Sequence, residues 1–438
     1  MKHRFFALFF FILSGFHFAY AQEEVTLEQV IGLGLQKNYD VQLAKKLSES
    51  AATTSDYVLG AFLPQINAIG ATVWNDNEQN LRFESRDPIS GEARSNNFTG
   101  SVQLVWTLFD GTRMFATRER ISQLAEQGEL VVKNQMINTI ASIIINYYDI
   151  VRQKQQLKAI QEQMSVSEER VKLAEKKLQV GTGIKPELLQ AKVDYNAQRT
   201  QVLQQETIIA QLKEQLNDIV GLQLPSVYDV ADTIVIDLTL RPDETFQNLD
   251  NTNYSLLAAR RNLNIANLSL RERRAEYLPF FNFNAAYNFS RNDNTRLINP
   301  FAAVFSQTEG FNYGFSVTFP ILTGFNTRRL TQLAKIEIDR QYLLYNQQRN
   351  TINVDLRNAF INYENAKKIL LIEEETIGLA KENVFIALES FKRGVNTFIE
   401  LRTAQQSLAE AYNRLISARY NAKLAETELL RLNGSLLQ

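Results

Sequence analysis

The sequence of 438 residues has no cysteine, and its only two histidines, His3 and His17, lie near its beginning. The absence of cysteine excludes disulfides, thiol nucleophiles and a lipid-modified N-terminal cysteine, and the scarcity of histidine leaves almost no imidazole for metal binding or acid–base chemistry. The 48 acidic and 47 basic side chains nearly cancel, so the broad basic field of nucleic-acid-binding proteins is also missing. We therefore expect no cofactor, metal or nucleic acid. We expect no enzymatic activity either, because no convergent set of polar residues stands out.

Long apolar runs are absent beyond the N-terminal segment, so the sequence predicts no transmembrane helix. Residues 1–21 begin with Lys2 and Arg4, continue through an apolar run and end in Ala19-Tyr20-Ala21. This order is typical of a cleaved signal peptide, whereas a membrane-anchoring helix needs about 20 apolar residues. We predict a signal peptide at residues 1–21, and a membrane anchor is the alternative.

The chain repeats itself at a nearly constant spacing. Asn38-Tyr39 recurs 215 residues later as Asn253-Tyr254, and Leu63-Pro64 recurs as Leu278-Pro279. Further on the spacing becomes 213, and the matching residues are Gly111 and Gly324, Gly181 and Gly394, Glu187-Leu188 and Glu400-Leu401, Ala191 and Ala404, and Gly221 and Gly434. A period this long does not fit a solenoid. It predicts two repeats, residues 22–221 and 243–438, joined by a linker at 222–242.

Each repeat has the same predicted order of helix, two strands, very long helix, tight tip and second helix. In the first repeat we expect a helix from Thr26 to Gly60, which Thr26 caps and Pro64 stops. Residues 111–179 and 325–393 contain no proline and one internal glycine each, so each predicts a helix of about 65 residues and about 100 Å.

Apolar residues spaced alternately three and four apart predict that these helices pack as coiled coils. They are Ile137, Ile140, Ile144, Tyr147 and Val151 in the first repeat and Leu401, Ala404, Leu408, Ala411, Leu415, Ala418, Ala422, Ala425 and Leu429 in the second. An ordinary bundle core is the alternative. The glycine-containing breaks near 181 and 394 are short, so the flanking helices must fold back as antiparallel hairpins.

Four segments alternate apolar or aromatic residues with small polar ones, which is the period-two pattern of a strand. The predicted strands are at about 64–76, 96–109, 279–291 and 310–322. Each has about the ten residues that a tilted strand needs to cross a bilayer. The residues expected to face lipid are Phe98, Val102, Leu104, Trp106, Phe281, Phe283, Tyr287, Phe289, Phe311, Tyr313, Phe315, Val317 and Phe319.

A soluble sandwich gives the same alternation, but three features favour a membrane sheet. The strands have bilayer-spanning length, and the connections 75–97 and 291–310 are long and polar like outer loops. The apolar stripes of the helices pack against one another, so no helix has a spare apolar face to cover the aromatic residues of the strands. Four strands cannot close a barrel, and an open edge in hydrocarbon leaves backbone groups unpaired. The chain must therefore oligomerise, and three copies would give 12 strands with room for a passage, whereas two would give a filled barrel.

The Leu-Pro strand entries, Val180-Gly181-Thr182, the segment from Gly394 to Glu400, the twofold repeat and the final Leu432-Asn433-Gly434 resemble the outer membrane efflux protein family typified by TolC. The resemblance covers essentially the whole chain after the signal peptide. It implies a mainly α fold with transmembrane β: a trimeric channel-tunnel, in which a 12-stranded outer-membrane β-barrel with four strands per chain continues into a long periplasmic α-helical barrel.

The resemblance also implies a function. Such a protein is the exit channel of a tripartite efflux or type I secretion system in the outer membrane of a Gram-negative bacterium, a passive conduit gated at its periplasmic helical tip. The implied partners are further copies of the chain, outer-membrane lipid, a periplasmic adaptor (membrane fusion) protein, and an inner-membrane transporter of RND, ABC or MFS type.

The resemblance implies gate residues at the tips. Two acids that ring the closed aperture in the family correspond here to Glu400 and Thr403, of which only Glu400 is acidic. Glu400 also completes a capping-box pattern with Thr397, so capping alone is an alternative to gating. Glu187 and Arg393 are further gate candidates, and a simple complement to a helix dipole is the alternative for both.

The candidates for docking the adaptor are the tip residues Val180, Gly181, Thr182, Gly394 and Val395. At Gly181 and Gly394 a tip without a side chain would let the adaptor's helical hairpin approach closely. A glycine that merely satisfies the turn is the simpler and compatible explanation. Two other classes of protein remain as alternatives: a trimeric surface adhesin, which would have its strands consecutive at the C-terminus, and a periplasmic coiled-coil adaptor, which would need soluble β domains.

Overall fold

The computed structural model describes residues 23–225, 228–240, 249–393, 395 and 397–437. The expected signal peptide at 1–21, part of the linker and Gly394 lie outside the described residues. Up to the linker the elements are β1 (Glu23–Glu24), α1 (Leu27–Lys37), α2 (Tyr39–Asp56), η1 (Val58–Phe62), β2 (Gln65–Leu81), β3 (Ile89–Asp110), α3 (Arg113–Gln179) and α4 (Lys185–Ile219). From the linker on they are β4 (Tyr228–Asp229), α6 (Leu249–Thr252), α7 (Tyr254–Ala275), β5 (Phe280–Arg296), β6 (Phe305–Thr318), α8 (Asn326–Lys392), α9 (Phe398–Asn433) and η2 (Ser435–Leu437).

The chain divides into two compact units. Unit 1 consists of Met1–Asn38, Thr139–Leu240 and Ile361–Glu428, and unit 2 consists of Tyr39–Asn138, Arg241–Phe360 and Leu429–Gln438. Each unit therefore takes chain from both halves of the sequence, because α3 and α8 each contribute to both units. Within the described residues, no helix combines the length and apolarity that a membrane crossing would require.

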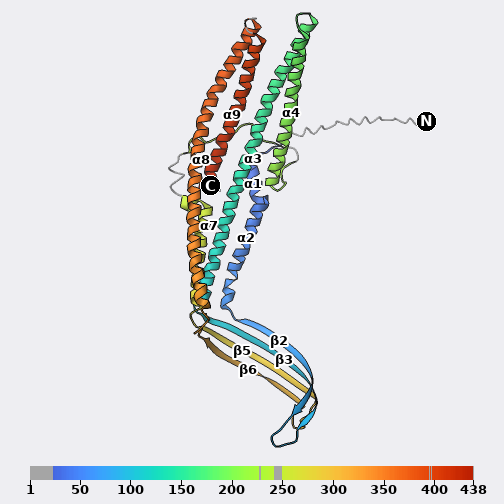
Figure 1. The fold of residues 1–438 in the computed structure, drawn as a ribbon, viewed down its shortest axis with the longest axis vertical. Coiled ribbons are helices and arrows are strands. Elements are labelled where there is room, and N and C mark those ends of the chain that lie inside the picture. Colours follow the sequence, from blue (N-terminus) through green and yellow to red (C-terminus); the bar gives the residue numbers. More distant parts are fainter. Residues whose placement is uncertain (1–22, 226–227, 241–248, 394, 396, 438) are drawn as a thin grey trace, which may run out of the picture. The chain divides into compact units, whose positions relative to one another are not determined.

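Unit 2 contains one antiparallel sheet with the strand order β2-β3-β5-β6 (Figure 1). Residues far apart in sequence are paired across its centre, where Val102 lies opposite Tyr287. Within the two hairpins, Gly70 lies opposite Gly100 and Phe283 opposite Phe315. The outermost strands of this sheet are β2 and β6, so one side of each has no partner strand within the described chain.

The strands are longer than the sequence predicted, at 17, 22, 17 and 14 residues. The polar connections expected at 75–97 and 291–310 are wrong: β2 and β3 stay paired as far as Leu81 and Ile89, and β5 continues to Arg296. The alternation of apolar and polar residues ends before the strands do, because backbone hydrogen bonds between strands form whatever the side chains are. Polar cross-strand pairs accompany the extension, for example Arg94 and Asp76, whose Nε and Oδ1 atoms are 3.1 Å apart.

The first helix, expected without a break from Thr26 to Gly60, is two helices that meet at Asn38. Thr26 caps α1 as predicted, through a capping box with Gln29. At Asn38 the backbone leaves the helix, with φ −58° and ψ 128°, and the side-chain amide donates to the carbonyl of Ile219 at 2.8 Å. The break therefore coincides with a contact between segments 181 residues apart in sequence, and helix propensity alone does not predict the break.

The same contact recurs in unit 2, where the Asn253 amide donates to the carbonyl of Leu432 at 2.8 Å. In both places a glycine with positive φ follows the end of the accepting helix: Gly221 has φ 71° and Gly434 has φ 78°. A side chain on Gly221 would collide with the Lys37 carbonyl, and one on Gly434 with the Thr252 carbonyl. These asparagines and glycines are among the residues that the sequence repeat matched. The repeat thus marks one packing motif used twice.

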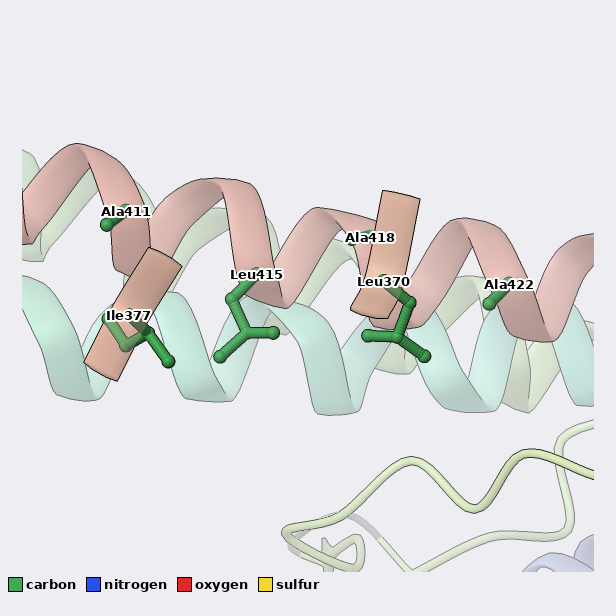
Figure 2. Close-up of a cluster of buried hydrophobic side chains, with 6 residues drawn as sticks. All are labelled: Leu370, Ile377, Ala411, Leu415, Ala418 and Ala422. Carbon is green, nitrogen blue, oxygen red and sulfur yellow. The ribbon is translucent and has the colours of Figure 1, made fainter. Parts of the chain in front are cut away.

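In unit 1, α3 pairs with α4 and α8 pairs with α9 as helical hairpins (Figure 1). The predicted coiled-coil residues of α3 are all buried, from Ile137 to Val151. Figure 2 shows the equivalent packing in the second hairpin, where leucine and isoleucine of α8 meet the alanine-rich stripe of α9. The cluster consists of Leu370, Ile377, Ala411, Leu415, Ala418 and Ala422.

Leu408 of the α9 stripe is only partly buried but still packs on this cluster, whereas the stripe leaves its predicted course at Ala425. Ala425 is only partly buried, and its neighbour Glu426 is buried instead. Glu426 accepts hydrogen bonds from the Lys423 ammonium at 2.8 Å and from the backbone N–H of Asp237 at 3.1 Å. Burial of this carboxylate is therefore compensated by a charge and by the linker.

The linker lies against both hairpins of unit 1. Its first part, β4, pairs in parallel with β1, and the Tyr147 hydroxyl donates to Val25 O at 3.0 Å while accepting from Ala231 N at 3.1 Å. The Lys154 ammonium lies 2.8 Å from Asp229 and 2.9 Å from Asp232. Burial lowers the pKa of Lys154, but its hydrogen bonds to the two carboxylates outweigh burial and hold the pKa above its usual value.

The second part of the linker is held by α8 in the same way. The Tyr363 hydroxyl donates to Asp237 O at 2.8 Å, and the Lys367 ammonium donates to Leu238 O at 2.7 Å. Ile236 and Leu238 pack on the cluster of Figure 2. One tyrosine and one lysine from each long helix therefore fix the linker across unit 1.

Candidate functional site: helical tips and strand faces

The first tip is the short turn between α3 and α4. Gly181 has φ 76°, and the N–H groups of Thr182 and Gly183 both donate to the Lys177 carbonyl at 2.9 Å. A Cβ on Gly183 would lie 2.9 Å from the backbone nitrogen of Leu178, whereas one on Gly181 would meet nothing within 4 Å. The turn therefore needs Gly183 for space and Gly181 for its backbone angle, and the backbone at Gly181 is open to an approaching partner.

Glu400 is part of the capping box that begins α9 at the second tip. Its carboxylate accepts from the Thr397 N–H at 2.7 Å, and the Thr397 hydroxyl accepts from the Glu400 N–H at 3.3 Å. The expected capping box is thus present, and the Glu400 side chain is exposed as well. The Thr403 hydroxyl donates to Ile399 O at 3.0 Å, and the Arg393 N–H donates to Glu389 O at 3.2 Å at the end of α8.

Apolar side chains at both tips are exposed. The exposed fraction is 73% for Val180, 65% for Ile184, 76% for Val395 and 72% for Ile399. Ile184 and Ile399 were missed by sequence reasoning. The available signal was their position beside a turn and outside the three-four spacing, where an apolar residue has no helix to pack on.

Glu187 lies in a recess of unit 1, between the first hairpin and α9. Besides Glu187, the residues around it include Leu173, Lys177, Leu401 and Gln405. Glu187 and Glu400 occupy matching sequence positions. The structure places them differently: Glu400 completes a capping box, whereas Glu187 faces a recess between two hairpins.

Asp194 connects the two hairpins and was not found from the sequence. It accepts from the Arg170 guanidinium at 3.3 Å and from the Gln190 amide at 2.9 Å, both within the first hairpin. On the other side, Arg402 of α9 places Nη2 3.9 Å from the Asp194 carboxylate. Only the folded unit brings these side chains together, so no spacing in the sequence reveals the contact.

The aromatic residues predicted to face lipid share one face of the unit 2 sheet. Ring centroids are 5.9 Å apart for Phe98 and Phe289 and 4.8 Å apart for Tyr287 and Phe311. Phe283 and Phe315 are 5.1 Å apart. The other residues predicted for this face, Val102, Leu104, Trp106, Phe281, Tyr313, Val317 and Phe319, are on the same alternation, and the first six are paired in the ladder.

The two tryptophans lie near the two ends of this aromatic band. Trp106 donates its indole N–H to Phe62 O at 2.9 Å, and Trp74 lies opposite Asn96, ten residues before Trp106 on β3. Ten residues extend about 33 Å along a strand, and a strand tilted by about 40° would then rise about 25 Å. This matches the apolar band of an outer-membrane barrel with interfacial aromatics at both edges.

Comparison with known proteins decides the family. A family model described as outer membrane efflux protein matches residues 30–222 and 246–435, which is most of the chain. The chain belongs to the outer membrane efflux protein family. This membership excludes the surface adhesin and the periplasmic adaptor considered above. As a family member, the chain resides in the outer membrane of a Gram-negative bacterium and extends into the periplasm.

Relatives and solved structures agree with this assignment. The chain is 21% identical over 383 residues to outer membrane protein TolC of Vibrio cholerae, covering 86% of this chain and 83% of TolC. It is 22% identical over 429 residues to the alkaline protease secretion protein AprF of Pseudomonas aeruginosa, covering 93% and 86%. The fold matches the outer membrane channel CmeC of Campylobacter jejuni with a TM-score of 0.75 and 17% identity, over 93% of this chain and 85% of CmeC. The chain thus has the channel-tunnel fold that the resemblance implied.

Proposed function

We propose that this outer membrane efflux protein works as a homotrimeric exit duct, which carries cargo from a periplasmic machine across the outer membrane without chemistry. The observation that carries the proposal is the four-stranded sheet of unit 2, which has an aromatic face and edge strands β2 and β6. An unpaired edge in hydrocarbon costs several kcal/mol for each backbone group left without a partner. Three copies that join β6 to β2 would form 12 strands and a water-filled passage.

The gate of this duct would be the two helical tips. In a trimer each copy contributes two tips around one axis, so Glu400 would form a ring of three carboxylates. Glu187 could add a second ring, and Arg393 a ring of the opposite charge. Thr403 replaces the second acid expected from the family, so the proposed aperture has fewer acidic side chains than a double ring.

A periplasmic adaptor would dock at the same tips. The exposed side chains of Val180, Ile184, Val395 and Ile399 offer apolar surface, and Gly181 offers open backbone. Gly394 and Thr182 complete the proposed docking set. The proposed inner-membrane partner of this duct is a transporter of RND, ABC or MFS type, and the similarity to both a TolC and a protease secretion protein supports a role in efflux or secretion.

Fractionation and conductance test the proposal. The full-length protein should be extracted from outer membranes only by detergent, run as a trimer on an unheated denaturing gel and form water-filled channels in planar bilayers. A monomer released into the periplasmic fraction without detergent would contradict the proposed duct.

A further inference from the structure

At its helix end, the face of the unit 2 sheet opposite the aromatic band includes Asp110, which lies opposite Phe280 and accepts from the Met114 N–H at 3.0 Å. From Thr107 outward this face carries no charged residue. It is defined by the odd-numbered residues of β2 and of β3 up to Thr107, and by the even-numbered residues of β5 from Asn282 to Asn294 and of β6. We call it the lumen face. Its side chains are asparagine, glutamine, serine, threonine, glycine, alanine and a few aliphatic residues. At the chain's average of 22% charged residues, a face of this size would carry several charges.

Charges are present in the same strands, but on the other face. Asp76 lies opposite Arg94 and Glu78 lies opposite Glu92, and all four share the alternation of the aromatic residues, beyond Trp74. Arg291 and Asp293 of β5 are on this face too, opposite Phe98 and Asn96 of β3, with an Nε to Oδ2 distance of 2.8 Å. The strands therefore sort their residues by face: charge beside the apolar band, and neutral amides and hydroxyls on the lumen face.

The amides of the lumen face bond to one another across the strands. Asn75 donates to Ser95 at 3.1 Å and Asn284 donates to Ser316 at 3.1 Å, while Asn288 donates to Asn312. Each asparagine or glutamine still has further donor or acceptor positions for water or a solute. The face is hydrophilic enough to be wet, yet it carries no fixed charge.

We infer that the membrane-spanning part of the duct is a neutral sleeve that transmits cations, anions and zwitterions without preference, so that selection by charge takes place elsewhere in the protein. The inference rests on the proposed function, because it requires the lumen face to line the passage. A lumen lined by one sign of charge raises the local concentration of oppositely charged solutes by about 10- to 1,000-fold and repels the others. In a trimer, each lumen charge would be present three times. The lumen face has no charged side chain from Thr107 outward, which fits cargo of either sign.

The absence of cysteine from the chain allows a local test. Asn288→Cys places one thiol per copy on the lumen face, and Tyr287→Cys places it on the aromatic face as a matched control. The purified trimer, in liposomes, is treated with water-soluble methanethiosulfonate reagents bearing either a trimethylammonium or a sulfonate group. The ratio of the two rates, divided by the ratio for a free thiol in solution, reports the potential at that site. At 0.1 M salt, only charges within about 10 Å contribute strongly.

The inference predicts a corrected ratio within about threefold of one for the Asn288→Cys protein. The charged side chain of Asp110 is nine positions along β3 from Ser101, the partner of Asn288, or about 30 Å away, which is beyond the screening distance. Adding Asn312→Asp creates a ring of three carboxylates and should favour the cationic reagent by about tenfold or more, which shows that the measurement is sensitive. A bias of about tenfold in the protein without that aspartate would overturn the neutral sleeve while leaving the duct intact. Failure of both reagents to label the Asn288→Cys protein, with labelling of the Tyr287→Cys protein instead, would overturn the duct and the sleeve together.

Discussion

At the scale of single residues, two asparagines have the same task in the two halves of the chain. Asn38 and Asn253 each turn the backbone out of a helix and donate an amide hydrogen to the last turn of a distant helix. Both positions were visible in the sequence as matched Asn-Tyr pairs. Their role was not visible, because the partner carbonyls lie about 180 residues away, with separations of 181 and 179.

Replacing Asn253 by alanine tests this contact. The side chain is 7% exposed and also caps α7 by accepting from the Leu256 N–H at 3.0 Å. Its loss leaves a buried carbonyl and a helix N-terminus without their partner, and should lower stability by about 1–3 kcal/mol. Thermal unfolding of the detergent-solubilised protein is the measurement. Asn267→Ala removes a hydrogen bond to Leu263 O on the exposed side of α7 and should change the stability little.

Glu400 is the residue whose structural and functional roles must be separated. As a cap it contributes about 1 kcal/mol to one helix end, and as a ring it would hold three negative charges at the aperture. Glu400→Gln keeps the hydrogen-bonding oxygen of the capping box and removes the charge. It should reduce cation preference and block by divalent cations in planar bilayers, at unchanged stability.

Glu28→Gln is the matched control for that experiment, because it removes an acid from the first turn of α1, away from the tips. Selectivity should remain at the wild-type value in this variant. If Glu400→Gln also leaves selectivity and block unchanged, Glu400 is only a cap and the gate lies at other residues.

At the scale of elements, sequence patterns worked where one stripe or face carries the signal. The three-four spacing identified the buried side of α3 and α9, and the period of two identified the aromatic side of the sheet. Both patterns are local consequences of burial. The ends of the strands depend on backbone pairing, and the break at Asn38 depends on a distant partner, so the local sequence patterns did not predict them. The contact of Asp194 with Arg402 escaped for the same reason.

The link between Asp194 and Arg402 predicts how the two hairpins of unit 1 are held together. Asp194→Asn and Arg402→Gln each remove one charge of a partly buried pair, and each should loosen the tips and raise the mean conductance of the trimer several-fold. The double variant should resemble Asp194→Asn alone, because the change at Arg402 then removes no contact that is still present.

The matched control is an ion pair whose two side chains belong to the same hairpin. Arg414 of α9 and Glu373 of α8 form a similar ion pair, with Nε 3.1 Å from Oε1. Arg414→Gln should leave conductance unchanged. Equal conductance of all these variants and the wild type would show that the Asp194 contact does not restrain a gate.

At the scale of the whole molecule, the sequence predicted the family and the split of four strands between two repeats, but not the two compact units. Each unit contains parts of both repeats. The linker is held on unit 1 by hydrogen bonds to four side chains of the long helices, Tyr147, Lys154, Tyr363 and Lys367. No local pattern marks those contacts. The repeat does, however, predict the register between copies. Gln103 pairs with Ala286 within one chain, and the repeat offsets convert this pair to Ser316 of one copy opposite Ala71 of the next.

A disulfide between copies tests the central claim, closure of the sheet by neighbouring chains, most directly. Ala71→Cys combined with Ser316→Cys should give a covalent trimer on a heated, non-reducing gel, because directly opposed residues lie about 5 Å apart and suit a disulfide. Gln103→Cys with Ala286→Cys should cross-link within each chain and leave the monomer mass unchanged, and Ala71→Cys with Phe315→Cys, on opposite faces, should not cross-link. Monomers alone from the first pair, with the intrachain control oxidised, would contradict the account.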